Sequence, residues 1–98
     1  MSQREAQLIE RAKQGDSAAF RELYEQNYSK IFSYIYRRVS NQHLAEDLAG
    51  DVFVRLVTKI DTYEHRGRPL LAWLYTVAGN LVRDHHRKKF ACAMDASR

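Results

Sequence analysis

The stretch 66–89, RGRPLLAWLYTVAGNLVRDHHRKK, constrains the fold of this chain more than any other segment. Pro69 suits the first position of a helix, because its φ is fixed near the helical value and its missing N–H needs no partner there. Behind it, apolar residues recur at the spacing of one buried helical face. They are Leu70, Leu74, Val77, Ala78, Leu81 and Val82. The stretch therefore predicts an amphipathic helix that lies against a core.

The opposite face of the same helix carries an aromatic ring, an amide and several cations. Its members are Trp73, Thr76, Asn80, Arg83, Arg87 and Lys88. Aromatic rings stack on unpaired bases, amides pair with base edges and arginines hold phosphates. This face predicts a nucleic-acid surface. A solvated basic helix end, favoured by the helix dipole, is the alternative explanation for part of the cluster.

The excess positive charge of the chain lies in its C-terminal third. The net charge is +4, and residues 1–63 carry nine basic and nine acidic side chains. Residues 64–98 carry seven basic and three acidic ones. A local excess of this kind is expected of a surface that faces phosphates.

The length and the cysteine content limit the class of protein. A chain of 98 residues makes one domain. No apolar run approaches the roughly 20 residues of a membrane span, and the opening MSQREAQ has no signal-peptide core. The single cysteine, Cys92, excludes an intrachain disulfide and suits a reducing compartment. We therefore expect a cytoplasmic protein without membrane insertion.

Three more helices are predicted, over residues 3–14, 17–39 and 42–60. Gly15 suits the end of the first helix and Asp16 the N-cap of the second. The second helix carries a broad apolar and aromatic stripe that we interpret as core. This stripe consists of Phe20, Leu23, Tyr24, Tyr28, Ile31, Phe32, Ile35 and Val39. The helix ends in the pair Arg37 and Arg38, which fits either a solvated turn or a phosphate contact.

The third helix begins after Ser40 and Asn41, either of which can cap it. Its predicted buried face consists of Ala45, Leu48, Ala49, Val52, Phe53, Leu56, Val57 and Ile60. Its outward face consists of Glu46, Asp47, Gly50, Asp51, Val54 and Arg55. A glycine inside a helix costs about 1 kcal/mol relative to alanine. A small, acidic face suits a closely approaching partner, whereas a plain solvated face is the other interpretation.

The predicted fold is all-α, a compact bundle of three main helices plus a short N-terminal helix. Residues 1–90 are predicted to form the domain, and residues 91–98 to form a disordered tail or the start of an interdomain linker. The polar connection 61–68 is too long for a tight helix–helix turn, so we expect it to be functional.

The chain offers no convincing constellation for catalysis. His85 and His86 are adjacent, so on a helix they diverge by about 100° and cannot easily bind one metal. No base can be placed beside Cys92, and no phosphate-binding or dinucleotide fingerprint is present. We therefore expect neither an enzyme nor a cofactor. A small metal-dependent nuclease is kept as a remote alternative that requires bound metal.

Three segments together resemble region 2 of the extracytoplasmic-function (ECF) sigma factors of the bacterial sigma-70 family. They are QLIERAKQGDSAAFRELYEQNY at 7–28, AEDLAGDVFVRL at 45–56 and DTYEHRGRPLLAWLYTVAGNLVRDHHRKK at 61–89. The resemblance covers most of the chain. The three motifs occur in order and at natural spacing, so they are more specific together than any one alone.

The resemblance implies a subunit that docks on core RNA polymerase and that reads and melts the promoter −10 element. The polymerase-docking positions would be Glu46, Asp47, Gly50 and Asp51, against the clamp helices of the largest subunit. The loop that receives a base flipped from the non-template strand would contain Tyr63, His65, Arg66 and Arg68. The −10-reading helix would carry Trp73, Thr76, Asn80, Arg83 and Arg87. An anti-sigma factor is an expected partner.

Three departures from the family qualify these expectations. The family usually has Gln where this chain has Gly50, so one docking hydrogen bond is missing. The loop is slightly longer than usual and ends in Arg68 and Pro69, so its base preference does not carry over. The family's second DNA-binding domain, which reads the −35 element, is absent from this sequence. The alternative to the sigma-factor domain is a sigma-like protein-interaction module that does not bind DNA.

Overall fold

The computed structural model describes residues 3–64 and 67–96, with side chains described as far as Lys88. Within these residues the chain is helical, without strands. Four α-helices and one short 3₁₀-helix follow each other: α1 (Gln3–Lys13), α2 (Ser17–Val39), α3 (Gln42–Lys59), η1 (Ile60–Thr62) and α4 (Leu70–Ala96). The predicted all-α class, with three main helices and a short leading one, is confirmed.

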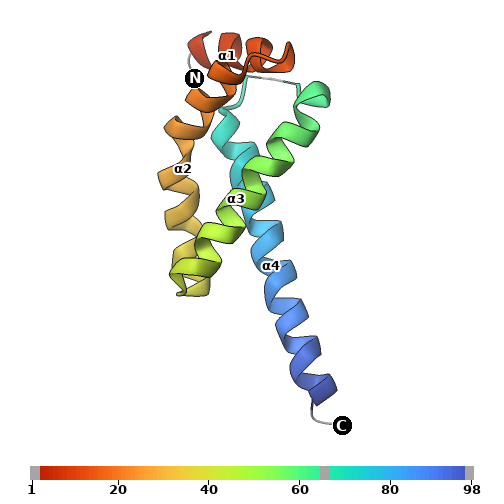
Figure 1. The fold of residues 1–98 in the computed structure, drawn as a ribbon. Coiled ribbons are helices and arrows are strands. Elements are labelled where there is room, and N and C mark those ends of the chain that lie inside the picture. The colour runs from red at the N-terminus through yellow and green to blue at the C-terminus, as the bar shows by residue number, and fades with distance from the viewer. Residues whose placement is uncertain (1–2, 65–66, 97–98) are drawn as a thin grey trace.

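The three long helices α2, α3 and α4 pack against one another, and α1 lies across the end at which α2 begins (Figure 1). The short α1 is held by the buried side chains of Leu8 and Ile9 and by an ion pair between Arg4 and Glu22 of α2. The C-terminal part of α4 extends beyond the bundle (Figure 1). The bundle therefore supports the first half of α4 and leaves its surface open along one side.

The core is built largely from the apolar faces that the sequence predicts, but two of the predicted core residues, Tyr24 and Val57, are exposed. Leu23, Ile31 and Ile35 of α2 are fully buried, as are Leu70 and Leu74 of α4. Complete burial of such a side chain stabilises the fold by about 1.5–3 kcal/mol. Val57, however, is 54% exposed, so its prediction as a core residue is wrong. Leu56 and Ile60 face the core, and Val57 is turned by about 100° from Leu56, which places it at the edge.

The predicted helix caps are confirmed at both turns. The side chain of Asp16 accepts hydrogen bonds from the backbone N–H groups of Ala18 (3.0 Å) and Ala19 (3.2 Å). A hydrogen bond from Arg11, together with these backbone donors, lowers the pKa of Asp16. Gly15 has a φ of +90°, which favours glycine at this turn. At the next turn Asn41 caps α3 by accepting from the N–H of Leu44 at 3.0 Å.

The structure shows features at both ends of α4 that the sequence did not predict. Pro69 precedes the first helical residue, and its carbonyl accepts a hydrogen bond from the N–H of Ala72. The N–H of Leu70 donates to Glu5 Oε1 on α1, at 2.8 Å, which fixes the start of α4 from a distant helix. At the other end, α4 continues to Ala96, past residue 90, where the sequence predicts the domain to end. The sequence FACAMDA has no Gly or Pro and is rich in helix-forming Ala and Met.

Candidate docking and nucleic-acid interfaces

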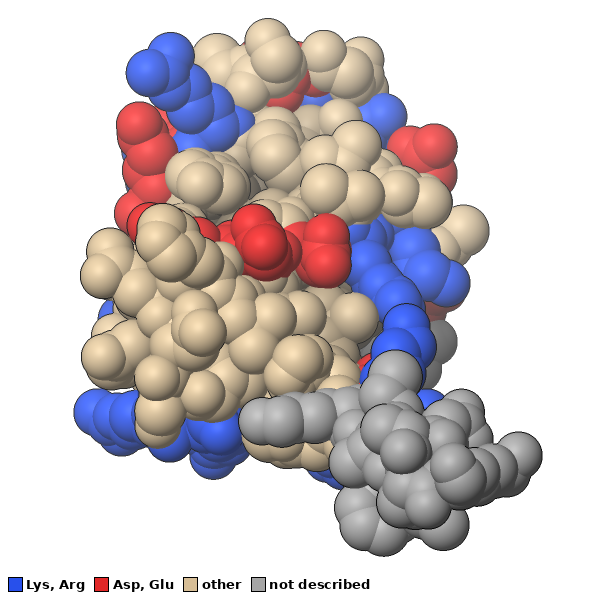
Figure 2. Space-filling model, turned by 60° about the horizontal axis from the view of Figure 1, so that its bottom comes forward, with Lys and Arg blue, Asp and Glu red and all other residues tan. Residues whose placement is uncertain are grey.

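The outward face of α3 is acidic and small, as predicted. Glu46, Asp47 and Asp51 are exposed, and Gly50 between them is half-buried. A Cβ atom added at Gly50 would meet no other atom within 4 Å. Packing within the chain therefore does not require glycine here. Figure 2 shows acidic side chains gathered near the centre of one face, with a broad area without charge below them and basic side chains at its right edge.

An aromatic row on α2 borders this acidic face, and three of its four rings, Tyr24, Tyr28 and Phe32, were predicted to lie in the core. Its rings, at successive helical turns, are Tyr24, Tyr28, Phe32 and Tyr36. Phe53 of α3 is 3% exposed and meets the Tyr24 ring edge-on, with 4.8 Å between centroids. Tyr24 and Tyr36 nevertheless remain 37% and 46% exposed. The signal in the sequence was the i, i+4 repeat of four aromatic rings, three of them tyrosines.

The aromatic row and the acidic face are electrostatically coupled. Burial, followed by the neighbouring Tyr24 and the negative charge of Glu46, raises the pKa of Tyr28. Glu46 is therefore close enough to Tyr28 to disfavour its phenolate. The two features together make one surface that carries both carboxylates and aromatic rings.

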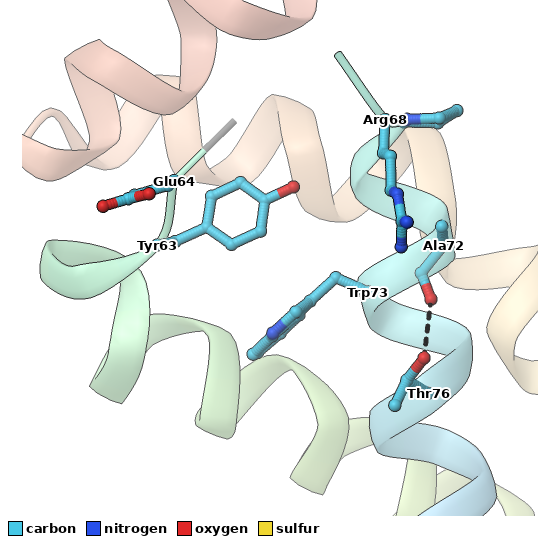
Figure 3. Close-up of a pocket in the computed structure, with 7 residues that line it drawn as sticks. Tyr63, Glu64, Arg68, Ala72, Trp73 and Thr76 are labelled. Atoms are coloured by element: carbon cyan, nitrogen blue, oxygen red, sulfur yellow. Dashed lines mark hydrogen bonds between the residues drawn. The ribbon is translucent and has the colours of Figure 1, made fainter. Parts of the chain in front are cut away.

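A hollow of about 500 Å³ separates the connection after η1 from the first turns of α4 (Figure 3). It is lined by Tyr63, Glu64, Arg68, Pro69, Ala72, Trp73 and Thr76. The side chains of Tyr63, Arg68 and Trp73 border the same space in Figure 3. Residues predicted from the loop and from the helix thus share one cavity. His65 and Arg66, which were also predicted here, lie outside the described residues.

The aromatic wall of this hollow is formed by Tyr63 and Trp73. Their rings meet edge to face, with 5.8 Å between centroids and 74° between planes. Such pairs contribute about 0.5–1.5 kcal/mol beyond the burial of their surface. Burial, and next the negative charge of Glu5, raises the pKa of Tyr63. The Tyr63 hydroxyl therefore ionises only at a higher pH than a solvent-exposed tyrosine.

Below the hollow, the predicted polar face of α4 is exposed and internally hydrogen-bonded. Thr76 Oγ1 donates to the carbonyl of Ala72 at 3.1 Å. Arg83 donates to Asn80 Oδ1, so the Asn80 amide group keeps its two N–H donors for another partner. Arg87 forms a 2.6 Å ion pair with Asp84. The face is therefore partly organised before it meets any ligand.

Two further findings concern other kinds of site. Among the described side chains, no group of three or more His, Cys, Asp or Glu residues could hold a metal ion. None of the helices in the described part of the chain is long and apolar enough to cross a membrane.

Comparison with known proteins places these features in a family. Residues 23–90 match the family Sigma-70 region 2. The chain is 43% identical over 86 residues to the ECF RNA polymerase sigma factor BldN of Streptomyces coelicolor, covering 88% of this chain and 33% of BldN. It is 38% identical over 81 residues to the ECF RNA polymerase sigma factor SigW of Bacillus subtilis, covering 83% of this chain and 43% of SigW.

A solved structure has the same fold. In a structure of the RsbN–BldN complex, one chain is 41% identical to this protein, with a TM-score of 0.74. The match covers 82% of this chain and 58% of that one. The chain therefore belongs to the sigma-70 region 2 family, within its ECF group. It spans less than half the length of BldN and SigW.

Proposed function

We propose that this chain is the promoter-recognition domain of an ECF sigma factor, which binds core RNA polymerase and recognises and melts the −10 element. The observation that carries the proposal is the hollow in which Tyr63 and Arg68 of the connection meet Trp73 of α4. The acidic face of α3 supports a separate docking function. The work of such a domain is binding and strand separation, so we propose no enzymatic activity.

The hollow is suited to an unpaired base. Its volume of about 500 Å³ is within the range of small-molecule sites, roughly 300–1,000 Å³. Extrusion of a base from a duplex costs a few kcal/mol. Stacking on an aromatic side chain returns about 1–3 kcal/mol per base, and Tyr63 and Trp73 are already held against each other. Capture of a flipped base in this hollow would thus stabilise the open strand.

On the polar face of α4, different residues would recognise bases and bind the phosphate backbone. The free N–H donors of Asn80 suit an acceptor on a base edge. Arg83 and Arg87 are exposed cations, which suit phosphates. The hydrogen bond from Arg83 to Asn80 would set the direction of the amide.

The docking surface would meet the clamp helices of the largest polymerase subunit. Glu46, Asp47 and Asp51 suit a basic partner, and Gly50 lets that partner approach the helix closely. The partly exposed rings of Tyr24 and Tyr36 add apolar area beside the carboxylates. An interface that combines aromatic rings with charged groups at its edge is typical of protein–protein recognition.

A regulatory partner and a location follow from the same proposal. Because BldN forms a complex with RsbN, we propose that this chain also binds an anti-sigma factor. Its site of action would be the cytoplasm, where polymerase and promoter DNA are found. Residues 1–90 would form the domain, and residues 91–98 would lead toward a linker.

The single tryptophan provides a direct test, because it lies in the proposed site. Single strands that bind the chain would be enriched from a randomised pool, and Trp73 fluorescence would be titrated with an enriched strand and with its scrambled version. We expect saturable quenching at lower concentrations of the enriched strand. The same emission change with both strands would argue against sequence recognition. No change with either would favour an interaction module that does not bind DNA.

A further inference from the structure

The three residues directly before α4 offer no side-chain acceptor for its first N–H groups. The first N–H groups of a helix have no partner within the helix, and a side-chain oxygen at the N-cap commonly accepts from one of them. Gly67, Arg68 and Pro69 carry no such oxygen. The helix that bears Trp73 therefore has to be capped from elsewhere in the fold.

The acceptor comes from α1. Glu5 Oε1 accepts a 2.8 Å hydrogen bond from the N–H of Leu70, the first residue of α4. At the other end of the connection, burial and then the negative charge of Glu5 raise the pKa of Tyr63. One half-buried carboxylate thus acts on both ends of the segment 63–70.

The helix α1 is held in place by buried side chains and by an ion pair. Leu8 and Ile9, which are 2% and 0% exposed, follow Glu5 by three and four positions and so lie on the same side of α1. Arg4 pairs with Glu22 of α2, and α1 also packs against η1, from which the connection leaves. Glu5 therefore projects from a helix that is fixed to the rest of the bundle.

The ring pair of Tyr63 and Trp73 depends on its supports, because open space lies beside it. The pair lines the hollow of about 500 Å³ and also a second hollow of about 380 Å³, which includes Lys59 and Thr62. Tyr63 comes from the connection and Trp73 from the first turn of α4 (Figure 3). How the two rings meet is thus set by how the connection and α4 are held, and Glu5 acts on both.

We propose that Glu5 is a positioning residue of the hollow, which holds the start of α4 against the connection so that Tyr63 and Trp73 form one wall for a captured base. The proposal rests on the promoter-recognition function proposed above. Glu5 acts through Leu70 and Tyr63 and not by contact with the strand. Its loss should therefore weaken the capture of one base and leave the contacts with the rest of the strand intact. A contact that only stabilises the fold would show no such preference.

The test compares an enriched single strand with strands that lack one base. A single abasic nucleotide is placed at each position in turn, and the captured base is the one whose removal costs the parent chain most affinity. If that base stacks on the aromatic wall, it should contribute about 5- to 150-fold to affinity. Both strands are measured on the same protein sample, so the ratio of the two affinities does not depend on the folded fraction.

Three variants separate positioning from stability. Glu5→Ala removes the acceptor, whereas Glu5→Gln keeps a side-chain oxygen for the N–H of Leu70. Asn41→Ala is the matched control, because it removes a capping oxygen from the start of α3. We expect Glu5→Ala to reduce the contribution of the captured base several-fold and to bind the abasic strand like the parent. Glu5→Gln and Asn41→Ala should keep the contribution seen in the parent.

The inference is wrong if Glu5→Ala keeps the parent's ratio, or if it weakens the intact and the abasic strand equally. In either case the proposed function stands, because the parent still captures a base. An equal reduction of the ratio in Asn41→Ala would also overturn the inference, since any loss of stability would then have the same effect. If no abasic position weakens binding by the parent, the hollow captures no base and both proposals fail.

Discussion

The N–H of Leu70 at the start of α4 donates a 2.8 Å hydrogen bond to Glu5 Oε1 of α1, across 65 positions of sequence. This contact ties the leading helix to the helix that carries Trp73. Because the first N–H groups of a helix have no partner within it, a carboxylate placed there satisfies one of them and interacts favourably with the helix dipole. The position of the candidate site therefore depends on α1.

Glu5→Ala should accordingly lower the free energy of unfolding by about 0.5–2 kcal/mol, the usual loss on removal of a helix cap. It should also weaken single-strand binding, because the start of α4 borders the hollow. Chemical denaturation and strand titration measure the two effects. Glu10→Ala, an exposed glutamate of the same helix, is the control. Equal stability of the two variants would mean that the Glu5 contact does not support α4.

Phe53→Ala should be among the most damaging core substitutions. The ring is 3% exposed and meets Tyr24 and Tyr28 of α2, so its loss should cost about 3–5 kcal/mol. The neighbouring Val54 is 60% exposed, and Val54→Ala should change stability by less than about 0.5 kcal/mol. Thermal melts of both variants check this. A small shift for Phe53→Ala would mean that α3 is turned differently about its axis.

The helices and their turns could be predicted because they depend on local chemistry. Asp16, Gly15 and Asn41 act within a few residues of their own positions, and apolar periodicity identified the buried side of each helix. The hydrogen bond from the N–H of Leu70 to Glu5 could not be predicted in this way, because nothing in the local sequence of either residue indicates a partner 65 positions away. The exposure of Val57 depends on where neighbouring helices end, which periodicity does not encode.

The candidate site shows the same limit. The polar line on α4 followed from helical spacing alone, whereas the pairing of Tyr63 with Trp73 depends on how the connection folds back on α4. Lys30 of α2 and Tyr75 of α4 line the same hollow, and only the packing of the two helices brings them together. The extension of α4 to Ala96 is not marked by apolar periodicity, because the helix propensity of residues such as alanine is enough to continue a helix.

Charge reversal on α3 should separate docking from folding. Asp47→Lys and Asp51→Lys should each weaken the binding of core RNA polymerase several-fold and leave the melting temperature nearly unchanged, since both side chains are exposed. Glu10→Lys on α1 makes the same change of charge away from this surface. A pull-down with core enzyme compares the three variants. Parent-like binding by both α3 variants would remove the assignment of this face.

The stability of the fold at high pH should depend on two partly buried tyrosines, Tyr63 and Tyr28. Burial raises the pKa of Tyr63 and of Tyr28 above the usual value of about 10. The folded state therefore holds these protons at a pH where the unfolded state releases them. Their contribution is complete below about pH 10 and is lost as the pH rises through the higher folded values.

Denaturation of the parent should thus show a fall in stability above about pH 10 that is smaller in Tyr63→Phe and in Tyr28→Phe. The difference between parent and variant isolates each phenol from the lysines that titrate nearby. Tyr36→Phe is the control, because Tyr36 is 46% exposed. Identical pH profiles for all four proteins would contradict the raised pKa values of Tyr63 and Tyr28.

Substitutions of Asn80 and of the arginines of α4 should affect strand binding differently: the first should reduce sequence discrimination, and the second should reduce overall affinity. Asn80→Ala should reduce discrimination between an enriched and a scrambled strand by about 1–3 kcal/mol, if the amide reads a base edge directly. Arg83→Ala should weaken both strands alike and lower the salt slope by about 0.7. Because Arg83 donates to Asn80, the two substitutions should not be additive. Equal loss for both strands in Asn80→Ala would move base reading to the hollow beside Tyr63.

Arg87 forms an ion pair with Asp84, so substitutions of these two residues should change the affinity for single strands in opposite directions. Arg87→Ala should lower the affinity for every strand. Asp84→Asn removes a carboxylate that competes with phosphate for the same guanidinium, so it should raise affinity and steepen the salt dependence. Measuring both variants on one strand over a salt series separates a loss of charge from a loss of fold, because unfolding would lower affinity in both. If Asp84→Asn binds no better than the parent, Arg87 does not contact the strand.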